Sequence, residues 1–143
     1  MQIAQVLRSK GATVATISRH ATIREALSVL AYRSIGALVV SEDGDAIEGI
    51  VSERDIVRAM NFVDGPVSEM TVESIMSTGV RACHLDDDVD TLMALMTDLR
   101  VRHLPVVVDG HLVGIVSIGD VVKARIDELE RDRQELVEYI NAR

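Results

Sequence analysis

Gly49-Ile50-Val51-Ser52-Glu53-Arg54-Asp55 decides the fold, because Gly114-Ile115-Val116-Ser117-Ile118-Gly119-Asp120 repeats its pattern later in the chain. Upstream of both motifs the two halves match at an offset of 66, which places the dipeptide Asp43-Gly44 on Asp109-Gly110. Downstream of these dipeptides the offset is 65, because the loop of the first copy holds one residue more. Identity concentrated in one segment, with apolar character kept elsewhere, predicts two copies of one structural unit that pack on each other.

Both copies predict the same order of elements, β-α-β-β-α. Thr22-Ile23-Arg24-Glu25 has the pattern of a capping box and opens a helix in the first copy, whereas the acidic residues 86–90 favour a helix start in the second. The Asp-Gly dipeptides predict hairpin turns. The expected strands are 14–17, 37–40 and 49–51 in the first copy and 80–85, 104–108 and 114–116 in the second, with a helix after each third strand. The expected fold class is therefore α/β (α+β).

The composition excludes several classes of function. The chain has 143 residues, of which 48% are apolar and 27% charged, so a folded protein with an ordinary core is expected. Its net charge is −8 and only three residues are aromatic, which argues against nucleic-acid polymers and anionic membranes as partners. No apolar run approaches the roughly 20 residues of a bilayer span and no secretory signal is visible, so we expect a cytoplasmic protein.

The cysteine and the histidines predict no chemical site. Cys83 is the single cysteine and is expected to be a small buried residue, not a nucleophile. The four histidines lack the spacing of zinc ligands, and the acidic residues 86–90 do not continue into a calcium-binding loop. We therefore expect no metal site, no catalytic residue and no required cofactor.

The repeated motif allows two interpretations. In the first, Ser-x-x-Asp at a strand-to-helix junction is a capping box and nothing more, because its serine satisfies free backbone N–H groups. In the second, the same atoms form a nucleotide site. The N-terminus of the helix then attracts a phosphate, the serine hydroxyl adds a hydrogen bond, and the aspartate accepts hydrogen bonds from the hydroxyls of a ribose.

The two copies differ in their basic residues. Arg54 lies inside the first motif, where the second has Gly119. Arg102 and His103 precede the central strand of the second copy, where the first has Gly36 and Ala37. A cation at each of these edges could neutralise a phosphate, or could form an ordinary ion pair on the surface.

Together with Val101-Arg102-His103-Leu104-Pro105-Val106, the two motifs resemble a pair of CBS domains, the tandem called a Bateman module. The resemblance covers nearly the whole chain. It implies two units that pack through their sheets about a pseudo-two-fold axis, with clefts that bind adenosine nucleotides such as AMP, ADP or ATP, and in some members NAD or S-adenosylmethionine. On this basis the first domain is expected at residues 7–66, a linker at 67–75 and the second domain at 76–131.

The same resemblance implies the site residues. Asp55 and Ser52 would line one cleft, and Asp120 and Ser117 the other, with aspartate on the ribose and serine on the phosphate, aided by Arg54. Residues at the strand edges would hold the base, namely Thr16, Ile35, Gly36 and Ala37 in the first copy and Ala82, Arg102, His103 and Pro105 in the second. Since only the first motif contains a basic residue, the Asp55 cleft is the expected site.

The segment 120–143 predicts a long C-terminal helix, because it contains neither glycine nor proline. An apolar stripe runs along it at heptad spacing, interrupted by Arg133; its members are Val122, Ile126, Leu129, Leu136 and Ile140. This stripe either packs on the chain's own domains or contacts a second copy. We expect a homodimer contact, because two-fold dimers are the commonest assembly.

These features predict a regulatory or sensor module that binds an adenine nucleotide, acts on a separate partner protein and is not an enzyme. One alternative is a ligand-independent protein-interaction module whose motifs are capping boxes only. The other is a small nucleotide hydrolase, which the absence of a paired nucleophile and base disfavours.

Overall fold

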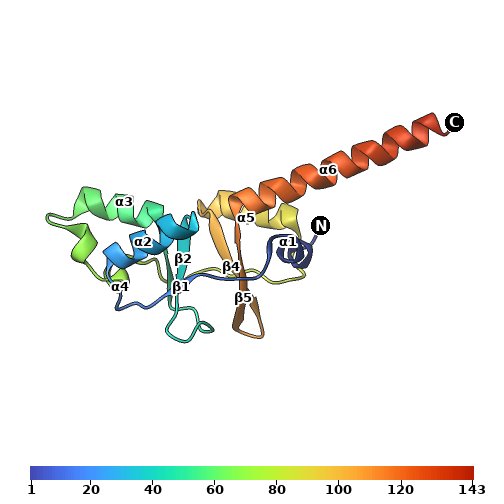
Figure 1. Ribbon diagram of the computed structural model, residues 1–143. Helices are drawn as coiled ribbons and strands as arrows, with labels where there is room; N and C mark the ends of the chain where they lie inside the picture. Colours follow the sequence, from blue (N-terminus) through green and yellow to red (C-terminus); the bar gives the residue numbers. More distant parts are fainter.

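Two similar units lie side by side in the computed structural model, which describes residues 1–143 (Figure 1). The first unit contains strands β1 (Thr16–Ile17), β2 (Ala37–Val40) and β3 (Gly49–Ser52), with β1 parallel and β3 antiparallel to β2. The second contains the antiparallel strands β4 (His103–Val108) and β5 (His111–Ser117). The helices are α2 (Ile23–Arg33) and α3 (Glu53–Phe62) in the first unit, and α5 (Val89–Leu99) and α6 (Ile118–Asn141) in the second. The predicted fold class is confirmed.

The repeated motif builds the same strand-to-helix corner in both units. Ser52 begins α3: its hydroxyl oxygen accepts a hydrogen bond from the Asp55 N–H at 3.2 Å, and its own N–H donates to the Asp55 carboxylate at 2.8 Å. Ser117 and Asp120 make the same two bonds at the start of α6, at 3.1 and 2.9 Å. The capping boxes that the motif predicts are therefore present, as is the one between Thr22 and Glu25 at α2.

The strand expected at 80–85 is reduced to a single parallel bridge between Cys83 and Val106. The Cys83 N–H donates to the carbonyl of Pro105, and the Val107 N–H donates to the carbonyl of Cys83, both at 2.9 Å. Cys83 is fully buried while Arg81 is exposed; of the flanking apolar residues, Val80 packs against the cluster between the sheets and Leu85 against the core of the second unit. Burial raises the pKa of the Cys83 thiol to about 12, as befits a small apolar core residue.

The segment that precedes each unit in the chain packs into the core of the other unit. The N-terminal helix α1 (Ile3–Lys10) inserts Ile3, Val6 and Leu7 into the core of the second unit. The segment 67–75, expected as a linker, forms the short helices η1 (Val67–Glu69) and α4 (Val72–Ile75) and packs into the core of the first unit. Val6 and Leu7 therefore lie in the second core, although Val6 precedes the expected first domain in the chain and Leu7 is its first residue.

Reciprocal backbone hydrogen bonds hold these crossing segments in place. At the start of α2, the Ile23 N–H donates to Met70 O, and the Val72 N–H donates to Ala21 O, both at 2.8 Å. At the start of α5, the Val89 N–H donates to Met1 O at 2.9 Å, and the Ile3 N–H donates to Asp87 O at 3.0 Å. Both pairs satisfy N–H groups that helix N-termini leave free.

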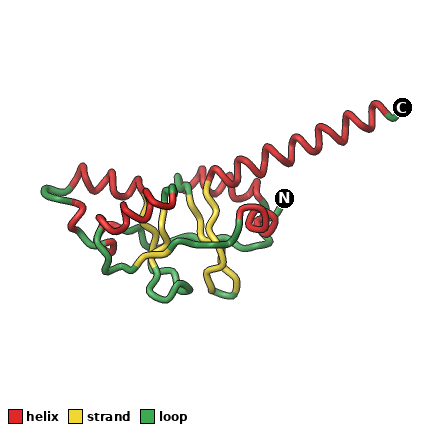
Figure 2. Tube along the Cα trace, viewed as in Figure 1, coloured by secondary structure: helices red, strands yellow, loops and turns green.

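The two units pack through their sheets. Ala37, Val39 and Ile50 of the first unit are buried in an apolar cluster whose partners include Leu112 and Ile115 of the second. Figure 2 shows the strands of both units in the middle of the molecule, with helices α2, α3, α5 and α6 along one side. This arrangement places the two strand-to-helix corners close to the junction between the units.

Helix α6 extends beyond the body of the molecule (Figure 1). Val121 and Ala124 are buried, but every residue from Leu129 onward is exposed. The residues of the apolar stripe are exposed along the helix, from 39% at Val122 to 61% at Ile140, so the chain's own domains leave much of the stripe uncovered. No helix of the structure combines the length and the hydropathy that crossing a bilayer requires.

Candidate functional site

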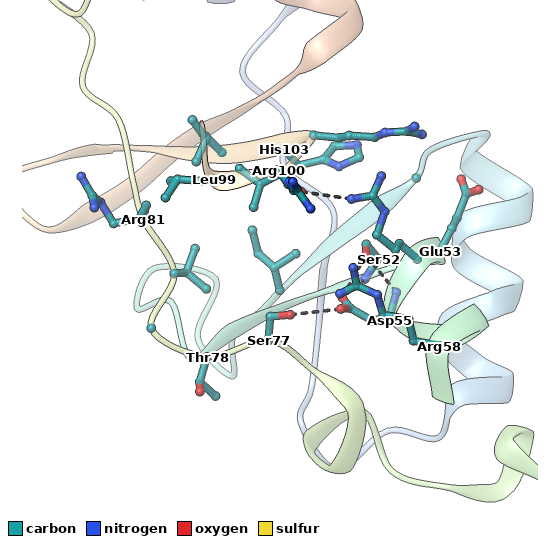
Figure 3. A pocket seen from close by; sticks show the side chains of 18 residues that line it. Ser52, Glu53, Asp55, Arg58, Ser77, Thr78, Arg81, Leu99, Arg100 and His103 are labelled. Carbon is teal, nitrogen blue, oxygen red and sulfur yellow. Dashed lines mark hydrogen bonds between the residues drawn. The ribbon is translucent and has the colours of Figure 1, made fainter. Parts of the chain in front are cut away.

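A cavity of about 360 Å³ lies at the junction of the two units, at the N-terminus of α3 (Figure 3). The first unit contributes Gly36, the end of β3 and the first turns of α3 to its lining, and the second contributes residues 99–104. Residues 77–81, which connect the two units, complete the wall. The volume falls in the range of about 300–1,000 Å³ that is typical of sites for small molecules.

Asp55 is held in a fixed orientation at one wall of the cavity. Its Oδ2 accepts hydrogen bonds from the Ser52 N–H at 2.8 Å and the Ser52 hydroxyl at 2.9 Å. Its Oδ1 accepts one from the Ser77 hydroxyl at 3.0 Å, as Figure 3 shows. A carboxylate offers about four acceptor sites, so these three bonds leave Oδ1 able to accept another. Asp55 can therefore serve the helix cap and still bind a ligand hydroxyl.

Five arginines line the same cavity: Arg54, Arg58, Arg81, Arg100 and Arg102. The Arg54 guanidinium reaches across the junction and donates to the carbonyl of Arg100 at 3.0 Å. In Figure 3, Arg58 lies beside Asp55, and Arg81 lies at the other end of the cavity. The cavity is thus basic in a chain whose net charge is −8.

His103 and Glu53 close the cavity over Gly36. A Cβ atom on Gly36 would lie 3.0 Å from Glu53 Oε1 and 3.3 Å from His103 Cε1, so a larger residue would push these side chains aside. Burial lowers the pKa of His103, and the charge of Lys10 lowers it further, against the opposing effect of Asp120. At neutral pH the ring is therefore uncharged and offers one donor and one acceptor.

Asp120, the counterpart of Asp55, has different surroundings. Lys10 at the end of α1 donates to Asp120 Oδ2 at 2.5 Å and to the carbonyl of Ile115 at 2.8 Å. Burial alone would raise the pKa of Asp120, but Lys10 and the backbone N–H of Ser117 outweigh burial, and the pKa is lowered. Asp120 does not line the cavity at Asp55; with Lys10 it borders a separate groove between α1 and α6.

About half of the predicted site residues line the cavity. Six do so, namely Gly36, Ser52, Arg54, Asp55, Arg102 and His103. Seven do not, namely Thr16, Ile35, Ala37, Ala82, Pro105, Ser117 and Asp120. Ala37 is buried in the interface between the sheets and Pro105 is buried in β4, which removes both from the wall.

Six polar residues of the lining were not predicted from the sequence: Glu53, Arg58, Ser77, Thr78, Arg81 and Arg100. A signal existed for Arg58, since residues four apart share one face of a helix and Arg54 precedes it by four. Ser77, Arg81 and Arg100 reach the cavity only because the two units approach each other, which no local pattern indicates.

Comparison with known proteins gives two matches to one family model. The model of the CBS domain matches residues 8–61 and again residues 72–127. A mitochondrial CBS domain-containing protein of Arabidopsis thaliana, CBSX3, is 36% identical over 96% of this chain and 71% of its own length. The crystal structure of a CBS-domain containing protein from Agrobacterium tumefaciens has a TM-score of 0.84 and 40% identity, covering 87% of this chain and 99% of that one.

Two similar structures contain adenosine compounds. A CBS domain protein from Pyrobaculum aerophilum, complexed with AMP, has a TM-score of 0.72 and 28% identity, covering 84% of this chain and 89% of that one. The CBS domain pair of protein MJ0100, in complex with 5′-methylthioadenosine and S-adenosyl-L-methionine, has a TM-score of 0.77 and 26% identity. It covers 90% of this chain and 98% of that one.

Proposed function

The chain belongs to the CBS-domain family as a tandem pair of such domains, and we propose that it binds an adenine nucleotide at Asp55 and regulates a separate partner protein. The observation that carries the proposal is one cavity in which a fixed carboxylate lies among five arginines. These groups suit the two polar parts of a nucleotide, its ribose hydroxyls and its phosphate. The adenosine compounds bound to two similar proteins support the same class of ligand.

Each side chain has a role in this proposal. Asp55 Oδ1 accepts a hydrogen bond from a ribose hydroxyl while Ser52 and Ser77 keep the carboxylate oriented. Arg54 and Arg58 bind the phosphate, aided by the positive end of the α3 dipole. The neutral ring of His103, above Gly36, offers a hydrogen-bonding surface to the base. No step of this mechanism forms or breaks a covalent bond.

The contrast between the two aspartates supports the Asp55 cleft over the Asp120 cleft. A ligand at Asp120 would have to displace the Lys10 ammonium, which makes two short hydrogen bonds there. A ligand at Asp55 displaces no ion pair. We therefore propose a single nucleotide per chain.

Regulation follows from the position of the cavity. Its lining comes from both units, so a bound nucleotide favours arrangements of the pair in which both walls contact it. A ligand shifts such an equilibrium only by the difference between its affinities for the two states. The partner protein would then bind one of the two arrangements more tightly.

Thermal unfolding with a panel of ligands tests the proposal. A ligand specific for the folded state at 100 times its Kd stabilises that state by about 2.7 kcal/mol. We expect AMP, ADP or ATP to raise the melting temperature, and an affinity pulldown to recover a protein whose amount changes when that nucleotide is added. No rise with any adenine compound would contradict the proposal.

The complete capping boxes favour one alternative. Both motifs satisfy their own helix N-termini without any ligand, as a ligand-independent interaction module requires. This alternative predicts an unchanged melting temperature with every nucleotide and equal recovery of a partner in the presence and absence of nucleotide.

A further inference from the structure

The repeat supplies a counterpart for every arginine of the cavity. At the offsets of the repeat, Gly119 and Lys123 correspond to Arg54 and Arg58 of the first unit. The counterparts of Arg81, Arg100 and Arg102 are Ala15, Ser34 and Gly36. The counterparts of the five arginines are thus one lysine and four uncharged residues. A requirement of the fold would act on both copies alike, so the fold does not explain these arginines.

The five arginines also lack acidic partners within the protein. None of them takes part in an ion pair, whereas Arg19 and Arg125 elsewhere pair with carboxylates. The hydrogen bond from Arg54 to the carbonyl of Arg100 is the single bond made by any of the five guanidinium groups. Like charges brought together without partners repel one another, and a bound anion would relieve this repulsion.

The charge of the cavity indicates how large that anion is. The five guanidinium groups are positively charged, and the carboxylates of Glu53 and Asp55 are negatively charged. Since His103 is neutral, the lining has a net excess of three positive charges. One phosphate group carries about −1.5 to −2 at pH 7. A nucleoside monophosphate therefore leaves part of the positive charge without a partner, and a longer phosphate chain matches it.

The arginines are arranged along such a chain. Arg54 and Arg58 belong to α3, which also carries Asp55, whereas Arg81 belongs to the connecting segment 77–81 and Arg100 and Arg102 belong to the second unit. Arg58 lies next to Asp55 and Arg81 lies at the far end of the cavity (Figure 3). A phosphate chain that starts from a ribose at Asp55 would pass from the first group of arginines to the second.

Resting on the function proposed above, we propose that the ligand is an adenine nucleoside di- or triphosphate, whose outer phosphates are bound by Arg81 and Arg100. S-adenosylmethionine carries a sulfonium cation and methylthioadenosine has no charge, so the five arginines disfavour both. AMP contacts mainly the wall formed by α3. The longer nucleotides contact both walls and so couple nucleotide binding to the arrangement of the two units.

Calorimetric titration of the full chain with ATP, ADP, AMP, S-adenosylmethionine and methylthioadenosine, without Mg²⁺, tests this inference. We expect ATP to bind at least about tenfold more tightly than AMP, since its outer phosphates form additional charge-assisted hydrogen bonds with the arginines. The double variant Arg81→Gln/Arg100→Gln should weaken ATP binding at least tenfold while changing AMP binding less than threefold. Arg33→Gln, which makes the same kind of substitution once at an exposed position on α2, is the control and should change neither.

The possible outcomes distinguish a failure of this inference from a failure of the proposed function. Equal affinities for ATP and AMP, or tighter binding of S-adenosylmethionine, would overturn the polyphosphate assignment and leave nucleotide binding intact. An equal loss of ATP and AMP affinity in the double variant would also overturn it. Failure of every adenine compound to bind would overturn both proposals. The melting temperature of the double variant without ligand shows whether it is folded.

Discussion

Gly49 and Gly114 occupy the same position of the repeat, but the structure gives them different neighbours. A Cβ atom on Gly49 would lie 2.7 Å from the backbone oxygen of Ser77, which the hydrogen bonds between Ile50 and Ser77 hold in place. A Cβ atom on Gly114 would lie 2.8 Å from the end of the Leu7 side chain, which can move. The same substitution should therefore affect the two positions unequally.

We predict that Gly49→Ala lowers the free energy of unfolding by about 1–3 kcal/mol, as overpacking does, and that Gly114→Ala lowers it by less. Urea denaturation of both variants measures the difference. Equal losses would show that Leu7 is as rigid as the backbone at Ser77.

The ion pair of Lys10 and Asp120 predicts a pH-dependent contribution to stability. The pKa of Asp120 in the folded chain is lowered from 3.8, so its contribution is present above that value and is lost as the pH falls through the folded pKa. Lys10→Met should lower the free energy of unfolding by about 1 kcal/mol at pH 7. The difference between wild type and variant should stay constant down to about pH 4 and shrink below it.

Urea denaturation between pH 7 and pH 3 checks this prediction, with Arg8→Met on the same helix as a control that keeps the ion pair. A difference that grows as the pH falls would contradict the assigned pairing. NMR titration should show a higher pKa for Asp120 in Lys10→Met than in the wild type.

At the scale of elements, the crossing of α1 to the second unit has a measurable consequence. Ile3 is fully buried in the second core, so Ile3→Ala should lower the free energy of unfolding by about 2–5 kcal/mol. Hydrogen exchange should increase in α5, β4 and β5 more than in the elements of the first unit. Faster exchange mainly in β1 to β3 would contradict the packing of α1 on the second core. Arg8→Ala, on the exposed face of α1, is the control.

The sequence was informative about local structure because local rules determine it. The capping boxes of α2, α3 and α6 and the tight hairpin turn at Asp109-Gly110 follow from short patterns and are present in the structure, whereas Asp43-Gly44 lies in a longer hairpin loop, residues 41–48. The core that α1 joins could not be predicted, since an amphipathic pattern shows that a helix has a buried face and not what covers it. The reduction of the strand expected at 80–85 to a single bridge at Cys83 is likewise visible only in the tertiary structure.

The candidate site was likewise predictable only where its residues share one local motif. Ser52, Arg54 and Asp55 share one motif and line the cavity together, as the repeat suggested. Arg81 joins them from the connecting segment and Arg100 from the second unit, both through tertiary packing, and Lys10 reaches Asp120 across 110 residues of sequence. The contrast between the two corners therefore becomes visible only in the structure.

At the scale of the whole molecule, the second half of α6 projects from the body, and neither unit covers it. We propose that it joins a second copy of the chain, because Leu129, Leu136 and Ile140 continue at heptad spacing on a surface that the body leaves exposed. Light scattering should find a dimer for the wild type and a monomer for Leu136→Asp. Gln134→Asp adds the same charge outside the stripe and should remain dimeric; a monomeric wild type would contradict the proposal.

Binding of one adenine nucleotide at the corner built by Ser52 and Asp55 is the claim on which the account depends, and calorimetric stoichiometry tests it most directly. Asp55→Asn preserves the size of the side chain and an oxygen that can cap α3, and Asp120→Asn makes the same change in the other corner. We predict one ATP per chain in the wild type and in Asp120→Asn, and at least tenfold weaker binding in Asp55→Asn. Unchanged affinity in Asp55→Asn, or a loss confined to Asp120→Asn, would contradict the account.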